Sequence, residues 1–207
     1  MKLCNLKFLA IWSVKGYYNN VYILLWGVWM KRCLIVVDYQ NDFVCGSLGF
    51  EKAKQLDEPI CKKIEEYRKS GGDIIFTLDT HGKEYLKTRE GRFLPVEHCI
   101  KGTDGHSLYG QTANAARETD VYFEKSAFGS DALYEYLKKS DYKEIELCGV
   151  VSNICVLSNA VLVKTALPEA DIKIDAMCTA SNDDALNEAA LDVLESIHAE
   201  IMNRGRI

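Results

Sequence analysis

The sequence predicts a three-layer α/β/α fold with a mostly parallel, Rossmann-like central sheet. Short runs of β-branched and aliphatic residues alternate along the chain with segments of helical periodicity. The strand-like runs are continuously apolar, as expected of parallel strands that helices cover on both faces. The 207 residues contain only three prolines and no repeat or low-complexity linker, which indicates one domain.

Five runs are predicted to be strands. They are rich in β-branched and aromatic residues, and turn or polar residues bound each of them. These runs are residues 33–37, 73–78, 121–124, 144–150 and 171–177. Because helical segments lie between the runs, the strands are expected to pair in parallel.

The segments between these runs have apolar residues at helical spacing. In "EPICKKIEEYRKSGG", Ile60, Ile64 and Tyr67 fall on one face, and the two glycines from Gly71 predict the end of the helix. "DALYEYLKK" and "NICVLSNAVLVKTAL" follow the same pattern and are predicted to be helices.

A last helix is predicted from a capping-box pattern that joins Ser181 to Asp184. Its apolar face is expected to contain Leu186, Ala190, Val193, Ile197 and Ile201. The longest irregular stretch covers residues 82–120, and loops of that length in a compact domain are often functional.

Reactive side chains stand where four of the predicted strands end. Asp38 ends the first strand, and Lys125 ends the third. Asp79 and His81 end the second, and the fourth leads through a turn to Cys155. Because parallel sheets bind ligands outside the carboxyl ends of their strands, these groups are expected to lie together.

The composition narrows the class of partner and the compartment. The formal net charge is −5 and no basic run occurs, so neither nucleic acid nor a membrane is expected as a partner. A small-molecule substrate is expected, and a homo-oligomer is left open. The eight cysteines form no CxxC pair and mostly lie in apolar runs, which favours a reduced, cytoplasmic protein.

Residues 1–29 differ from the rest of the chain in their pattern of apolar residues. Their apolar runs are interrupted by Lys15, Gly16, Asn19 and Asn20, so neither reaches the ~20 residues that span a bilayer. We interpret this segment as an upstream extension, with a misassigned start as one explanation, and place the working domain at residues 30–207.

Cys155 is predicted to lie in the first turn of a helix. Unpaired N–H groups and the helix dipole favour the thiolate there, and the same N–H groups can hold an oxyanion. Lys125 nearby would stabilise the thiolate, and Asp38 could take the thiol proton and later activate a water. This set suits acyl transfer through a thioester; the alternative is a core cysteine near a solvated lysine.

A second cluster combines a carboxylate with imidazoles. Asp79 and His81 are two residues apart, so both side chains project to one side of an extended segment. His98, in the long loop, could fold back beside them and complete a three-ligand metal site. Such a set with open positions suits Zn²⁺, Mn²⁺ or Fe²⁺; the alternative is a polar strand end. His106 and His198 are interpreted as surface residues.

Five stretches together carry a resemblance to a known family. They are "IVVDYQNDF", "LDTH", "EHCIKGTDG", "FEKSAF" and "GVVSNICVLSNA". In this order they resemble the nicotinamidase branch of the isochorismatase-like cysteine hydrolase superfamily, from about Lys31 to the last helix. The resemblance implies hydrolysis of a small carboxamide, with nicotinamide to nicotinate in pyridine nucleotide biosynthesis as the first choice.

The resemblance also implies roles for the catalytic residues. Asp38 would be the acid and base, Lys125 its charge partner and Cys155 the nucleophile. The peptide bond between Val150 and Val151 would be cis, and N–H groups of Val151 and Cys155 would form the oxyanion hole.

The resemblance further implies a metal ion and a substrate pocket. Asp79, His81 and His98 match the ligands of a divalent ion, expected to be Zn²⁺ with Mn²⁺ or Fe²⁺ as alternatives, which holds the pyridine nitrogen in nicotinamidases. The pocket walls are expected to include Phe43, Leu94 and Phe128.

The sequence departs from the family pattern at several positions. Thr80 stands in place of a tryptophan, and Leu94 in place of an aromatic residue, with Glu97 as an extra residue before the third ligand. Asn153 replaces an aspartate, and the nearest candidate for a fourth metal ligand is Glu84. These departures weaken ring stacking and leave the choice of amide open.

Three functions from different classes remain. The first is the cysteine amidohydrolase, acting on nicotinamide or, as the alternative, on another small amide or ureido compound. The second is a non-haem iron oxygenase built on the Asp-His-His set, which gives Cys155 no role. The third is a binding protein that has lost catalysis.

Overall fold

The computed structural model describes residues 31–205. Residues 1–29 lie outside this range, so the domain boundary at residue 30 stays a prediction. Within residues 31–205, no helix is long and apolar enough to cross a membrane.

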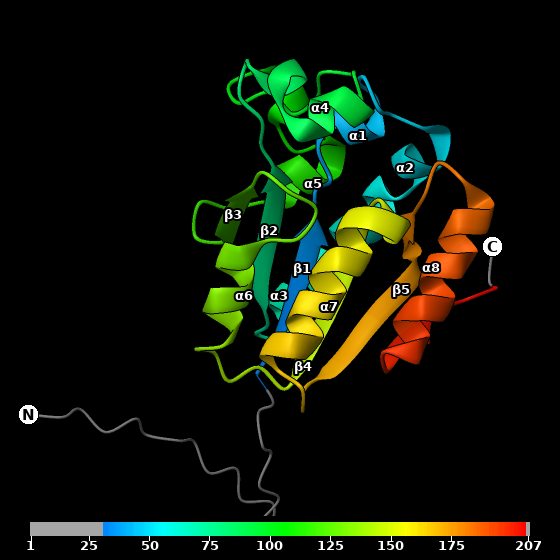
Figure 1. The fold of residues 1–207 in the computed structure, drawn as a ribbon. Helices are drawn as coiled ribbons and strands as arrows, with labels where there is room; N and C mark the ends of the chain where they lie inside the picture. The colour runs from blue at the N-terminus through cyan, green and yellow to red at the C-terminus, as the bar shows by residue number, and fades with distance from the viewer. Residues whose placement is uncertain (1–30, 206–207) are drawn as a thin grey trace, which may run out of the picture.

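Six strands form the sheet at the centre of the described residues (Figure 1). Their bounds are β1 (Arg32–Val37), β2 (Asp73–Asp79), β3 (Val121–Lys125), β4 (Glu144–Val150), β5 (Asp171–Ala180) and β6 (Ala199–Met202). The spatial order is β3-β2-β1-β4-β5-β6, and every neighbouring pair is parallel. The predicted three-layer α/β/α class is confirmed, and all five predicted strands are present.

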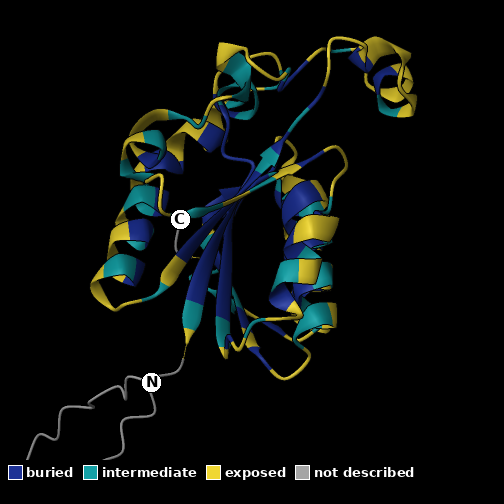
Figure 2. Ribbon diagram, turned by 90° about the vertical axis from the view of Figure 1, so that its left-hand side faces the viewer, coloured by how far each residue is buried: buried dark blue, intermediate teal, exposed yellow. Residues whose placement is uncertain are grey.

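Helices cover both faces of the sheet, and Figure 2 shows its strands buried between them. One layer contains α2 (Glu51–Gln55) and α3 (Asp57–Lys69). The other contains α6 (Asp131–Leu137), α7 (Leu157–Ala166) and α8 (Asp184–Ser196). The predicted helices at 58–72, 131–139 and 153–167 are therefore observed, with ends shifted by a few residues.

The residues of β1 divide between two apolar clusters. Leu34 and Val36 pack in the cluster that contains Ile60 of α3. Ile35 packs in the cluster on the opposite face, with Val163 of α7. All of these side chains are inaccessible to solvent, which explains why the strand is apolar along its whole length.

The start of α8 differs from the predicted capping box. Asp183 caps the helix, because its carboxylate accepts a hydrogen bond from the N–H of Leu186 at 3.0 Å. The hydroxyl of Ser181 accepts one from the N–H of Asp183 instead. The predicted face is also wrong in part, since Leu186 and Val193 are exposed. The buried residues of α8 are Ala190, Leu191 and Leu194.

The end of α8 differs as well, because the predicted helix contains a strand. The helix stops at Ser196, and His198 adopts a left-handed conformation with φ of 71°. Ile201 then lies in β6, which pairs with β5, and not on the helix. The apolar spacing of Ile197 and Ile201 mimics a continuing helix, and no glycine marks the turn.

The stretch predicted to be irregular folds into short helices beyond the carboxyl ends of β1 and β2, at the top of Figure 1. These are η1 (Tyr85–Lys87), α4 (Arg89–Phe93), η2 (Asp104–His106) and α5 (Gly110–Ala115). They lie near α1 (Asn41–Val44), which follows β1 and contacts η2. The whole group stands over the strand ends that carry the predicted site.

Candidate active site

Asp38, Lys125 and Cys155 meet beyond the strand ends. The Nζ atom of Lys125 lies 2.6 Å from Asp38 Oδ2 and 3.6 Å from Cys155 Sγ. It also donates to the carbonyl of Ala127 at 3.0 Å. All three predicted residues are buried, so the sequence-based expectation that they lie together is confirmed, whereas their roles in catalysis stay a prediction.

Asp38 is held in place by the neighbouring strand. Its backbone is left-handed, with φ of 47°, a conformation that aspartate tolerates better than most residues. Its N–H donates to the carbonyl of Thr77 at 3.1 Å, and its Oδ1 accepts a hydrogen bond from the Thr77 hydroxyl at 2.7 Å. The second carboxylate oxygen is left to face Lys125.

The approach to Cys155 needs a glycine at the end of β4. Gly149 has φ of 106°, and a Cβ atom there would lie 2.1 Å from the carbonyl oxygen of Val37. The peptide bond between Val150 and Val151 is cis, as the resemblance implies. The π-helical turn η3 (Ser152–Val156) then carries Cys155 into α7. The donor role of Val151 and Cys155 stays a prediction.

Asn159 is a buried residue that sequence reasoning missed. Its Nδ2 donates to the carbonyl of Cys155 at 2.8 Å and to that of Phe128 at 3.1 Å. Its Oδ1 accepts from the N–H of Ser130 at 3.0 Å. The side chain therefore ties the segment after β3 to the helix that carries Cys155. A polar residue one turn after the cysteine was the available signal.

The pKa of the Cys155 thiol is raised well above its usual value, first by burial and then by the negative charge of Asp38. Lys125 acts in the opposite direction without reversing the shift. This shift favours the thiol over the thiolate that the helix start and Lys125 were expected to stabilise, and the role of Cys155 as the nucleophile stays a prediction. Burial also raises the pKa of Asp38, although Lys125 offsets part of this effect. A base with a raised pKa next to a thiol is suited to accept its proton.

Lys125 keeps its proton in this buried site. Burial lowers the pKa of its ammonium group, but the negative charges of Asp38 and Asp79 raise it more. Its Nζ atom also lies 3.4 Å from Asp79 Oδ1. The lysine therefore connects the thiol side of the site to the cluster of predicted metal ligands.

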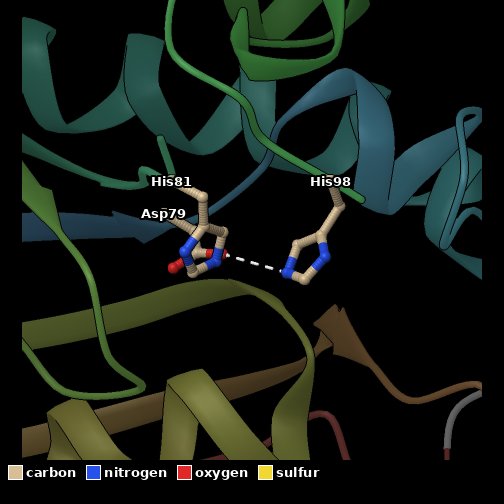
Figure 3. Close-up of side chains that lie close together, drawn as sticks. All are labelled: Asp79, His81 and His98. Atoms are coloured by element: carbon tan, nitrogen blue, oxygen red, sulfur yellow. Dashed lines mark ion pairs between the residues drawn. The ribbon is translucent and has the colours of Figure 1, made fainter. Parts of the chain in front are cut away.

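Asp79, His81 and His98 form a compact buried group (Figure 3). Their ligand atoms all lie within 4.8 Å of one another. Asp79 Oδ2 is 2.9 Å from His81 Nε2 and 3.4 Å from His98 Nε2. Burial raises the pKa of Asp79, but the two imidazoles and Lys125 lower it more, so the carboxylate is ionised at neutral pH.

The donor atoms of this group fit a divalent transition metal. His98 Nδ1 lies 2.8 Å from the carbonyl of Val96, which can only accept, so Nδ1 donates there and Nε2 is the nitrogen that faces the cluster. His81 Nε2 is buried and, although it lies 2.9 Å from Asp79 Oδ2, makes no hydrogen bond of good geometry within residues 31–205. Two imidazole nitrogens and a carboxylate oxygen are ligands that Zn²⁺ accepts.

The fourth group near this cluster is Glu90, not Glu84. Glu90 Oε1 lies 3.8 Å from His81 Nε2 and 3.7 Å from His98 Nε2. Glu84 is exposed and pairs with Lys87 on the surface. The candidate taken from the sequence was therefore wrong, because the short helix α4 folds back over the cluster and brings a later residue to it.

Aromatic and apolar side chains surround the cluster. The ring of Phe43 lies 5.4 Å from that of His98, between centroids. Tyr85, which sequence reasoning missed, packs 4.7 Å from His81 and donates to the carbonyl of Leu94 at 2.9 Å. Leu94 is partly exposed and Phe128 is half exposed, and their role in binding substrate stays a prediction.

Thr80 stands where the family pattern has a tryptophan, and its side chain makes polar contacts of its own. Its hydroxyl donates to the carbonyl of Leu78 at 3.0 Å and lies 2.8 Å from His106 Nε2. On an extended segment it points away from the side shared by Asp79 and His81. His106 is half-buried, so its interpretation as a surface residue is wrong, whereas His198 is exposed as predicted.

Comparisons with known proteins agree with this geometry. The isochorismatase domain family matches residues 32–205. An uncharacterised isochorismatase family protein, PncA of Bacillus subtilis, is 35% identical over 147 residues, which cover 64% of this chain and 78% of the relative. The crystal structure of nicotinamidase/pyrazinamidase PncA from Bacillus subtilis superimposes with a TM-score of 0.76 at 30% identity, covering 84% of this chain and 100% of that one.

A more distant structure shares the fold. Pyrazinamidase of Pyrococcus horikoshii, solved in complex with zinc, gives a TM-score of 0.73 at 23% identity and covers 83% of this chain and 98% of that one.

Proposed function

The chain belongs to the isochorismatase family, and we propose that it is a cysteine amidohydrolase that converts nicotinamide and water to nicotinate and ammonia. Cleavage of an amide C–N bond follows from the family and its nicotinamidase relatives. The observation that carries the proposal is the position of Lys125, within 2.6 Å of Asp38 and 3.6 Å of Cys155. This is a thiol, a base and a cation in one buried site.

The reaction begins with the transfer of the thiol proton to Asp38. The Cys155 sulfur attacks the amide carbon as Asp38 takes its proton, and Lys125 stabilises the negative charge that develops at the sulfur. The N–H groups of Val151 and Cys155 receive the oxyanion of the tetrahedral intermediate. Asp38 then returns the proton to the leaving nitrogen, the C–N bond breaks, and ammonia departs from a thioester.

The second half of the reaction uses the same groups. Asp38 removes a proton from a water, which attacks the thioester carbon. The C–S bond breaks, the carboxylic acid product is released, and the Cys155 sulfur regains its proton from Asp38. Each group therefore ends the cycle in the protonation state in which it began.

Asp79, His81 and His98 would hold a divalent ion, with Glu90 as a fourth oxygen donor. We favour Zn²⁺, because two imidazoles and a carboxylate suit it and the Pyrococcus pyrazinamidase was solved with zinc. Such an ion supplies a Lewis acid that binds and orients the heteroaromatic ring of the substrate. Phe43, Leu94 and Phe128 would line the pocket around this ring.

The protein is expected to act in the cytoplasm on a small molecule. The seven cysteines of residues 31–205 are all free, which supports the reducing cytoplasm as the location. The substrate is a small molecule, and neither nucleic acid nor membrane has a part in the reaction. Whether copies of the chain associate is tested by sedimentation of the active protein.

An ammonia-release screen tests the function. Nicotinamide, pyrazinamide, an aliphatic amide and a ureido acid are offered to the zinc-loaded protein, and nicotinamide is expected to give the highest kcat/KM. Cys155→Ala should abolish turnover, whereas the exposed Cys45→Ala should not change it. An inert nicotinamide with a hydrolysed ureido acid would replace the substrate, and a fully active Cys155→Ala would remove the thioester mechanism.

A further inference from the structure

We infer that Gln40 and Asp42 are positioning residues that hold the three candidate metal ligands in place through the backbone. They stand two and four residues after Asp38 in the chain, and the hydrogen bonds of their side chains within residues 31–205 do not reach Cys155. The inference rests on the proposed function only in requiring that Asp79, His81 and His98 bind a divalent ion. The identity of the amide does not affect it.

Gln40 takes the place of a missing strand residue beside Asp79. The pairing of β1 with β2 ends at Val37 and Thr77, so the backbone of Asp79 has no partner on that strand. The side chain of Gln40 supplies one, because its Oε1 accepts from the N–H of Asp79 at 2.8 Å and its Nε2 donates to the carbonyl of Asp79 at 2.9 Å. These two bonds imitate the pairing of a strand.

A third hydrogen bond fixes the amide group itself. Gln40 Nε2 also donates to the carbonyl of His106 at 2.8 Å, and the side chain is inaccessible to solvent. Both donors and the acceptor are thus used, so the amide has one defined orientation. Gln40 therefore holds Asp79 against the segment that contains η2.

Asp42 acts on the two histidines. Its Oδ2 accepts from the N–H of Cys99 at 2.8 Å, next to His98 in the chain. Cys99 is left-handed, with φ of 45°, and its carbonyl accepts from the N–H of His81 at 3.0 Å. The Asp42 carboxylate thus holds Cys99 in its strained conformation. Cys99 directly follows His98 and accepts a hydrogen bond from the backbone of His81.

The chain packs tightly around Asp42. A Cβ atom on Gly105 would lie 2.0 Å from Asp42 Oδ2, so a larger residue there would push the carboxylate out of its present position. The N–H of Ser47 donates to the other carboxylate oxygen at 3.3 Å. The position of the carboxylate is therefore fixed from several directions.

These contacts matter because the ligands come from two separate segments. Asp79 and His81 end β2, whereas His98 returns after sixteen intervening residues that include η1 and α4. Metal sites need their ligands held within about 0.5 Å of the productive geometry. Gln40 and Asp42 supply this constraint from one short segment. The segment that follows β1 therefore carries Asp38 and also aligns the metal ligands.

Metal affinity tests the inference. Zn²⁺ is titrated into metal-free protein against a chromophoric chelator, at a temperature where circular dichroism shows every variant folded. Gln40→Met and Asp42→Ala are expected to raise the Kd by about 10- to 100-fold, as loss of groups that orient metal ligands does. Asp42→Asn should recover part of the affinity, because its amide oxygen can still accept from the Cys99 N–H.

Matched controls separate positioning from general damage. Gln55→Met and Asp192→Ala change exposed residues of the same types and should leave the Kd within about twofold. The alkylation rate of Cys155 in metal-free Asp42→Ala should also stay within about twofold, because the thiol site does not contact Asp42.

Three results would overturn the inference: a wild-type protein that binds no Zn²⁺, a Kd unchanged in Gln40→Met and Asp42→Ala, or an Asp42→Asn no better than Asp42→Ala. Failure of the amidase proposal gives a different result, since nicotinamide would then be inert while the Kd values still shift as expected.

Discussion

The ammonium nitrogen of Lys125 lies 3.6 Å from the sulfur of Cys155, yet the pKa of that thiol is raised. Burial and the Asp38 carboxylate outweigh the single positive charge. The resting thiol is therefore protonated, and formation of the nucleophile depends on proton transfer to Asp38.

This state predicts how Cys155 reacts with iodoacetamide. In metal-free protein its alkylation is expected to be slow at pH 7 and to rise above pH 9, since only the thiolate reacts. Lys125→Met should slow it further, because loss of the positive charge raises the pKa. Added Zn²⁺ should speed it at least about tenfold at pH 7, because a nearby dication favours the thiolate.

Peptide mapping by mass spectrometry measures this rate, with exposed Cys45 in the same molecule as the internal reference. Faster labelling of Cys155 than of Cys45 at pH 6 without metal would contradict a raised pKa.

Removing the base should affect turnover more than binding. Asp38→Asn keeps the shape of the side chain but cannot accept the thiol proton, so kcat is expected to fall at least about 100-fold while KM for nicotinamide changes little. Steady-state ammonia release measures both constants, and the exposed Asp131→Asn serves as the control. An equal loss in both variants, or a rise in KM alone, would argue against proton transfer to Asp38.

Removing a metal ligand should have the opposite kinetic effect. His98→Ala is expected to lose bound zinc and to raise KM for nicotinamide at least about tenfold, because the ion's proposed task is to hold the substrate ring. Elemental analysis gives the zinc content per chain. His198→Ala, which changes an exposed histidine, should retain both zinc and KM. Chelator-resistant activity in zinc-free protein would remove the metal from the proposal.

The proposed contact of Leu94 with the substrate predicts a gain of affinity. Leu94→Trp should lower KM for nicotinamide by about two- to tenfold, since an aromatic pair contributes about 0.5–1.5 kcal/mol beyond its buried area. Leu86→Trp, at an exposed position in η1, is the control and should have no effect. Equal changes in both variants would show that Leu94 does not face the ring.

A buried charge cluster under α3 predicts a pH-dependent loss of stability. Lys63 Nζ lies 2.7 Å from Glu146 Oε1 and 2.8 Å from Asp175 Oδ2. Burial raises the pKa of Asp175, but the bonds from Lys63 and Asn203 lower it more. Since the folded pKa lies below the unfolded one, Asp175 stabilises the protein above about pH 4 and loses this effect as the pH falls further.

Lys63→Met should therefore lower the free energy of unfolding by about 3 kcal/mol at pH 7, because two buried carboxylates lose their cation. The difference from wild type should shrink below pH 4. Urea unfolding at both pH values measures it, with the exposed Lys62→Met as the control. A loss that does not depend on pH would mean that packing of the Lys63 stem dominates.

The sequence predicts the sheet and the reactive strand ends well because both depend on local patterns. Continuous apolar runs mark buried parallel strands, and residues such as Asp38 and Lys125 stand directly after them. The strand β6 was missed because Ile197 and Ile201 continue the helical spacing of α8 through a left-handed His198.

The details of the site depend on contacts that sequence spacing does not show. Glu90 approaches His81 and His98 only because α4 folds back, and this packing has no signature in the sequence. The raised pKa of Cys155 reflects burial among several charges, whereas its position at a helix start alone suggested the opposite shift.

The parallel order of the sheet separates two ends of the protein that can be treated independently in engineering. Every residue proposed for chemistry lies at or beyond the carboxyl ends of the strands. The turns at residues 138–143 and 167–170, which lead into β4 and β5, lie at the opposite end. A surface linker or an immobilising support attached through those turns would leave the substrate entrance free.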